Sequence, residues 1–215
     1  MAQRPATMRL SGRCSAPPEA VYDLLADLRA HLRWGGAEQA GNHRLLSLEA
    51  PDGPAAAGTV FVTTGAIPMS RRRWQDRSTV TSALRPLTFA FVTEATVGVR
   101  RRPLQARYLH SYVMTSCAGG STVTYELTQE RIVNPFLRLG VPVIRRITWQ
   151  VAAPWFARRG LSNLLRDAES AVAVCPGPEP LTADPAAGGV QPSGEPRPDR
   201  GASASRHLEV NRHGR

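Results

Sequence analysis

The chain has 215 residues, of which 42% are apolar, 6% aromatic and 20% charged. This length suits one domain, or one domain plus a tail, and is ample for a sizeable core. With no glycine period, no sustained heptad and only three cysteines, the sequence excludes a collagen, a coiled coil and a small disulfide scaffold. All 27 basic residues are arginine, and the formal net charge of +10 favours an anionic partner.

The first elements in chain order are a strand and a helix. Residues 7–14 alternate in polarity, which predicts a strand. Pro17 and Pro18 suit the first turn of a helix, which the pattern predicts over residues 19–32. The apolar residues of this helix recur at helical spacing and form one stripe that faces a core: Val21, Tyr22, Leu24, Leu25, Leu28 and Leu32.

Six further strands are predicted, with no convincing helix between them. The segments are rich in Val, Thr, Phe and Tyr, and Gly or Pro residues separate them. They span residues 43–49, 58–66, 72–83, 87–98, 104–117 and 121–132. Successive strands with short connections predict an antiparallel meander. After Asn134 and Pro135 the pattern is helical to about Val174, and Pro142 and Pro154 are expected to kink or split that helix.

The last forty residues form a separate segment. Residues 176–215 contain 7 Pro and 6 Gly and no aromatic residue. Such a segment cannot bury enough apolar surface to offset the entropy lost on ordering. We therefore predict one folded domain at residues 1–175 and a disordered tail at residues 176–215.

The cysteines and the N-terminal residues bear on the compartment. Cys14, Cys117 and Cys175 are far apart and show no paired spacing, which is typical of thiols in a reducing environment. The first residues lack the apolar region of a secretory signal, and no stretch reads as an apolar span of about 20 residues. We expect a cytoplasmic protein. We also expect that this protein can bind peripherally to the inner face of the membrane.

Strand alternation predicts which side chains share the covered face of the sheet. Trp74, Asp76 and Ser78 share one face of their strand, and Glu94 is expected on the opposite, exposed face of the next strand. The aromatic members indicate which faces are covered. The predicted ligand-binding residues on these faces are Trp74, Phe89, Phe91, His110, Tyr112, Met114 and Tyr125.

Three segments resemble a known family. The segment 16–28, followed by Trp34, is similar to the entry helix of the SRPBCC superfamily, the START-like or helix-grip proteins that include polyketide cyclases and lipid-transfer proteins. The segments 74–80 and 119–125 fit the same pattern. The resemblance covers about residues 7–174.

The resemblance implies an α+β helix-grip fold, in which a curved antiparallel sheet of about seven strands wraps around a long C-terminal helix. It also implies a hydrophobic cavity between the sheet and that helix. The sequence departs from the family pattern at His110, where an aromatic residue is common, and in the length and interruptions of its C-terminal helical region.

Arginines are expected to converge at one end of the meander, because alternate turns of a meander lie at the same end. We call this group the arginine rim, and it consists of Arg71, Arg72, Arg73, Arg100, Arg101 and Arg102. One interpretation is an entrance that attracts an anionic ligand head or an anionic membrane. The other is a solvated charged end that keeps the protein soluble.

His110 is the candidate for any catalysis. If it faces the cavity, it is placed to act as a general base, with a tyrosine orienting a carbonyl. The alternative, which we favour, is a core histidine with a hydrogen-bond partner. Asp76 is expected to pair with a neighbouring arginine. No phosphate-binding loop, nucleophile elbow or metal-ligand pattern is found in the sequence, so we expect neither a cofactor nor a metal.

Residues 136–159 interleave apolar and aromatic side chains with five arginines. A basic helix of this kind suits a membrane interface, and a helix that covers a cavity would look similar. Nucleic-acid binding lacks a supporting motif. We expect the chain to bind, and to be able to transfer, a hydrophobic small molecule such as a lipid, polyketide or isoprenoid. The alternatives are a polyketide cyclase or dehydratase that uses the same cavity, and a membrane-surface interaction protein.

Overall fold

The computed structural model describes residues 5–37, 44–66, 73–97, 104–133, 149–150 and 153–174. The chain divides between Gly177 and Pro178, and everything described below belongs to the first unit. The predicted tail at residues 176–215 lies outside the described residues, so the domain boundary and the disorder of the tail stay predictions.

A seven-stranded antiparallel sheet forms most of this unit. The strands lie in the order β1-β7-β6-β5-β4-β3-β2, so all neighbours except β1 and β7 follow one another in the chain. Their bounds are β1 Ala6–Cys14, β2 Arg44–Glu49, β3 Val60–Ala66, β4 Arg73–Leu84, β5 Thr88–Val97, β6 Leu104–Cys117 and β7 Gly120–Val133. The predicted meander is confirmed. The strand β1 is added at one edge of the sheet, where it pairs with β7.

The N-terminal helical segment is shorter than its pattern predicts. Helix α1 spans Pro18–Ala26, and the short helices η1 (Leu28–Ala30) and η2 (Arg33–Ala37) follow it. The prediction of one helix over residues 19–32 is wrong because Asp27 takes an extended backbone conformation. Its carboxylate accepts a hydrogen bond from the backbone N–H of Arg29, at 3.1 Å, and so starts a new helical turn.

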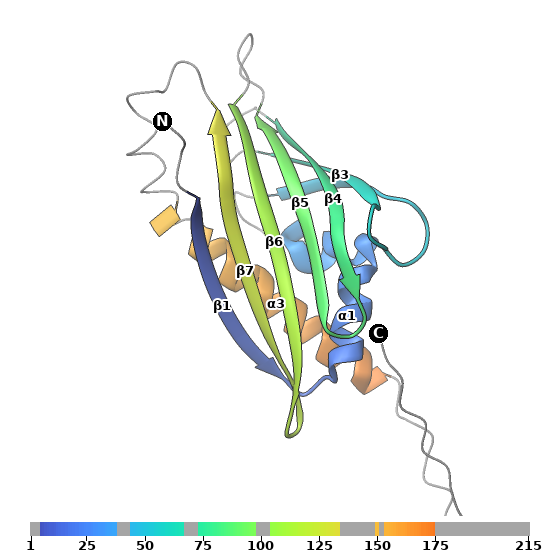
Figure 1. The fold of residues 1–215 in the computed structure, drawn as a ribbon. Coiled ribbons are helices and arrows are strands. Elements are labelled where there is room, and N and C mark those ends of the chain that lie inside the picture. Colours follow the sequence, from blue (N-terminus) through green and yellow to red (C-terminus); the bar gives the residue numbers. More distant parts are fainter. Residues whose placement is uncertain are drawn as a thin grey trace, which may run out of the picture. The chain divides into compact units, whose positions relative to one another are not determined.

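The C-terminal helix α3 spans Ala153–Val174 and lies along the concave side of the curved sheet (Figure 1). Its buried residues Leu161, Leu164, Leu165 and Ala168 form the predicted apolar stripe. The part of the predicted helical region at residues 134–148 lies outside the described residues. Sheet and helix together give the α+β helix-grip architecture that the sequence predicts.

The core is densest where α1 meets the sheet. Tyr22 of α1 contacts Phe89 of β5 edge to face, with 6.0 Å between ring centroids. Phe89 and Met114 are almost fully buried at this end, with 0% and 1% of their surface exposed. The predicted inward faces are therefore confirmed, and α1 fills one half of the concave surface that they form.

Candidate functional site

The other half of the concave surface encloses a cavity of about 490 Å³. The inner faces of β2 to β7 form one wall, and His31, η2 and the first half of α3 form the other. The lining residues used below are His31, Trp34, Phe61, Thr63, Asp76, Ser78, Phe91, Thr93, Tyr108, His110, Tyr112, Tyr125, Phe156 and Ala157. A mostly apolar cavity with a few polar groups is the usual form of a small-molecule site.

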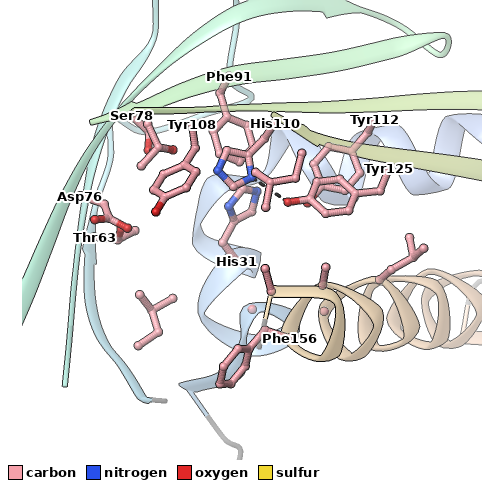
Figure 2. A pocket seen from close by; sticks show the side chains of 18 of the residues that line it. His31, Thr63, Asp76, Ser78, Phe91, Tyr108, His110, Tyr112, Tyr125 and Phe156 are labelled. Carbon is pink, nitrogen blue, oxygen red and sulfur yellow. Dashed lines mark hydrogen bonds between the residues drawn. The ribbon is translucent and has the colours of Figure 1, made fainter. Parts of the chain in front are cut away.

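Aromatic rings make up much of the wall, and they stack on one another (Figure 2). His110 lies parallel to Phe91, with centroids 4.5 Å apart and 11° between the planes. Tyr112 stacks on Tyr125 with centroids 4.6 Å apart. All four residues come from neighbouring strands, where cross-strand pairing places Phe91 opposite His110 and Tyr112 opposite Tyr125. Stacking locks these side chains, so the wall is preformed.

His110 lines the cavity and also has a partner. Its Nδ1 is 2.9 Å from the hydroxyl of Tyr125 and forms a hydrogen bond with it (Figure 2). Burial lowers the pKa of His110 to about 3, and the nearby His31 adds to this effect. The imidazole is therefore neutral at physiological pH and a weak base. The hydrogen-bond partner of the favoured prediction is confirmed, but His110 lies on the cavity wall and not in the closed core.

His31 is a cavity residue that the sequence analysis did not single out. It is buried, and its Nε2–H donates to the backbone oxygen of Leu25 at 3.1 Å. Its ring packs against Trp34 and Phe61. Burial lowers the pKa of His31 to about 4. The signal was present in the sequence, because His31 lies three residues after Leu28 on the apolar stripe.

Polar side chains gather at the end of the cavity beside β3 and β4 (Figure 2). The hydroxyls of Ser78 and Thr93 are 2.8 Å apart and share a hydrogen bond. Gln129 Nε2 donates to the hydroxyl of Tyr108 at 3.4 Å. The pKa of Tyr108 is raised, mainly by burial and further by the negative charge of Asp76. This end of the cavity is therefore lined by hydroxyl and carboxyl groups.

Asp76 is the ionisable group at this polar end. Among the described residues, none donates a hydrogen bond to its Oδ1, which is buried. The expected arginine partner is thus not found in the described part of the chain. Burial raises the pKa of Asp76 from 3.8 to about 7. The carboxyl therefore exchanges its proton near neutral pH, which the sequence alone did not indicate.

The seven predicted ligand-binding residues divide into two groups. Phe91, His110, Tyr112 and Tyr125 line the cavity. Phe89, Met114 and Trp74 share the inward face but are not among the lining residues: the first two lie in the core near α1, and Trp74 lies against Gly65. Contact of any of them with a ligand stays a prediction.

The arginine rim lies almost entirely outside the described residues. Only Arg73, the exposed first residue of β4, is described, and Arg71, Arg72, Arg100, Arg101 and Arg102 are not. The strand ends next to these segments are neighbours in the sheet, because Trp74 pairs with Val97 and Val97 pairs with Leu104. The rim itself stays a prediction.

The first turns of α3 carry exposed aromatic side chains close to the cavity. Phe156 lines the cavity and is 37% exposed, and Trp155 is 54% exposed. The guanidinium of Arg159 lies 5.5 Å from the ring centroid of Trp155.

No helix in the described ranges is long and apolar enough to cross a membrane.

Comparison with known proteins supports the fold. No family model matches the chain, and no curated protein matches it in sequence. An uncharacterised protein from Rhizobium leguminosarum matches in structure with a TM-score of 0.56 and 12% identity, over 78% of this chain and 96% of that one. A protein of unknown function from Staphylococcus aureus matches with a TM-score of 0.52 and 12% identity, over 79% and 97% of the chains.

A protein from Rhodobacter sphaeroides gives a similar match, with a TM-score of 0.52 and 13% identity over 80% of this chain and 95% of that one. At such identities the likeness concerns the fold alone. The seven-stranded curved sheet, the helix α3 along its concave side and the matching solved structures define a helix-grip protein.

Proposed function

We propose that this protein binds a hydrophobic small molecule in the cavity between the sheet and α3, as a member of the SRPBCC superfamily. The observation that carries the proposal is a preformed cavity of about 490 Å³ with stacked aromatic walls and a carboxyl, Asp76, beside the hydroxyls of Thr63 and Ser78 at one end. An occupant of lipid, polyketide or isoprenoid type fits this division, with its apolar body against the rings and one polar group near Asp76.

The energy of binding comes mainly from apolar burial. An occupant that removes ~200 Å² of apolar surface from water gains about 5 kcal/mol, at ~25 cal/mol per Å². The loss of translational and rotational freedom offsets part of this gain. Stacked walls reduce a second cost, because Phe91, Tyr112 and Tyr125 are already held in place before the ligand arrives.

Transfer to or from a membrane is the extension of this proposal. Trp155 and Phe156 are exposed beside the cavity, and Arg158 and Arg159 are exposed on the same turns of α3. Aromatic and arginine side chains together suit an anionic membrane interface. The arginine rim would act in the same sense, by attracting the membrane or an anionic part of the ligand that stays at the entrance.

Native mass spectrometry of the full chain, purified from its own host, tests the binding proposal. We expect a discrete added mass that is lost on denaturation. A cavity-filling variant, Ala157→Trp, should abolish the added mass, because Ala157 lines the cavity. The matched control is Ala171→Trp, at an exposed position of the same helix. Ala157→Leu provides a milder variant if the Trp variant does not fold. Equal ligand content in all these proteins would refute the proposal.

A second candidate function is catalysis on a polyketide-like chain held in the same cavity, as a cofactor-independent cyclase or dehydratase. Asp76 favours it, because a carboxyl with a pKa of about 7 is suited to both give and take a proton at neutral pH. His110 is disfavoured as the base by its pKa of about 3. Turnover that survives Asp76→Asn without a change in its pH profile would remove this candidate.

A further inference from the structure

The polar end of the cavity has one acid and no basic counterpart among the described residues. Asp76 points inward from β4, and no described residue forms a salt bridge with it or hydrogen-bonds to its buried Oδ1. Buried carboxylates normally have a cation or several donors beside them. Whenever Asp76 is ionised, the site therefore holds a negative charge that the described part of the chain does not balance.

The groups that face Asp76 are neutral on every described element packed around it. Thr63 on β3 and Ala95 on β5 are its cross-strand neighbours. The titratable groups that line the rest of the cavity are Tyr108, His110 and Tyr112 on β6, Tyr125 on β7, and His31, which follows η1. The tyrosines are protonated, because burial raises their pKa values. Both imidazoles are unprotonated, because burial lowers their pKa values.

From α3 only apolar side chains contribute to the wall, including those of Phe156 and Ala157.

The rings of the cavity add a second feature that favours positive charge. The faces of Tyr, Phe and Trp rings attract cations through their quadrupole. In Figure 2 the ring of Tyr108 lies between Asp76 and the stacked pair of Phe91 and His110.

We propose that the occupant of the cavity is a hydrophobic amine, bound with its ammonium group at Asp76 and its apolar body along the aromatic wall. This inference rests on the proposed function and specifies its ligand class. The ammonium supplies the missing counter-charge, and the neighbouring hydroxyls of Thr63 and Tyr108 are placed to accept further hydrogen bonds from it.

Other ligand classes fit the polar end of the cavity less well. A carboxylate or phosphate there would face Asp76 with the same sign of charge and no described cation to relieve it. An alcohol can hydrogen-bond to the carboxyl but leaves its charge unbalanced once Asp76 ionises. The net charge of +10 slows the approach of a cation, so the prediction concerns equilibrium affinity rather than the association rate.

Three probes with the same naphthalene body test the proposal: 2-(2-naphthyl)ethylamine, 2-(2-naphthyl)ethanol and 2-naphthylacetic acid. Isothermal titration of the full chain at pH 8 should give the tightest binding for the amine, about tenfold or more tighter than the alcohol, and the weakest for the acid. The amine affinity should fall as the pH drops below 7, because protonated Asp76 no longer pairs with the ammonium.

Proton release distinguishes a direct charge pair from a general effect of cavity shape. At pH 7, titrations in two buffers of different ionisation enthalpy should show about half a proton released per amine bound and none per alcohol. Asp76→Asn should bring the amine to within about threefold of the alcohol and abolish the release. Glu94→Gln, on the exposed face of β5, is the matched control and should change neither quantity.

The outcomes distinguish failure of the proposed function from failure of the inference alone. If none of the three probes binds, the proposed function fails together with the inference. If the alcohol binds as tightly as the amine, or the acid binds most tightly, the cavity is a binding site but its ligand is not an amine. If the amine preference persists in Asp76→Asn, the ammonium does not lie at Asp76 and the inference is overturned.

Discussion

Replacing Asp76 with asparagine should make the ligand-free protein more stable above neutral pH. The side chain keeps its size and loses its charge, so the substitution removes the cost of burying an ionised carboxylate. That cost follows from the pKa, which burial raises from 3.8 to about 7. At about 1.4 kcal/mol per tenfold change in proton affinity, the penalty is about 4 kcal/mol at pH 8. Water in the open cavity makes this an upper bound.

The sign of the pH dependence follows from proton binding in the two states. Between pH 4 and pH 7 the folded protein holds a proton on Asp76 that the unfolded chain has already lost. The contribution of Asp76 to the free energy of unfolding is therefore highest below pH 4 and falls as the pH rises to 7. The advantage of Asp76→Asn should grow over this range and level off above pH 7.

Urea unfolding of both proteins at pH 4, 5, 6, 7 and 8 measures this difference directly. Contributions of His31 and His110 are common to both proteins and cancel. Glu94→Gln, at an exposed position on the neighbouring strand, should stay within about 0.5 kcal/mol of the parent. A stability difference that is constant with pH, or one that favours the parent at pH 8, would show that the carboxyl of Asp76 is not desolvated.

Three further substitutions probe the packing of the site and the fold. His110→Phe should cost about 1 kcal/mol at pH 7.5, because Tyr125 loses a hydrogen bond. Between pH 6.5 and pH 5 the variant should regain about 2 kcal/mol relative to the parent, because only the unfolded parent takes up a proton on this histidine, whose folded pKa is about 3. Equal urea midpoints at all pH values would contradict this. Gly65→Ala should destabilise by about 1–3 kcal/mol and shift tryptophan fluorescence, because an added Cβ collides with the ring of Trp74; an unchanged melting temperature would argue against that contact. Gly160→Ala should stabilise by about 1 kcal/mol in thermal unfolding, since the added Cβ has no described heavy atom within 4 Å in the interior of α3.

Much of the sheet was accessible from the sequence, because strand alternation has a strict period and short connections restrict the topology. Alternation identified the inward positions correctly, including Phe91, His110, Tyr112 and Tyr125. It could not tell which half of the concave face would be hollow. That depends on where α1 packs, and this packing takes Phe89 into the core.

The raised pKa of Asp76 was missed because it comes from burial, which no local pattern encodes. The carboxyl is desolvated inside a cavity whose lining residues are distant from one another in sequence. His31 lies three residues after Leu28, so the apolar stripe already indicated its place on the wall. The interruption of the helix at Asp27 has no such signal in the helical pattern.

The position of α1 separates the part of the sheet that maintains the fold from the part that surrounds the cavity. Side chains near α1, such as Phe89 and Met114, are packed on all sides, and changes there cost the large amounts typical of core truncation. Residues such as Thr63 and Ala157 border empty space and have fewer partners to lose. On the proposed function, substitutions at the cavity end change what the site binds without rebuilding the fold, so we expect ligand specificity to diverge faster than architecture among related chains.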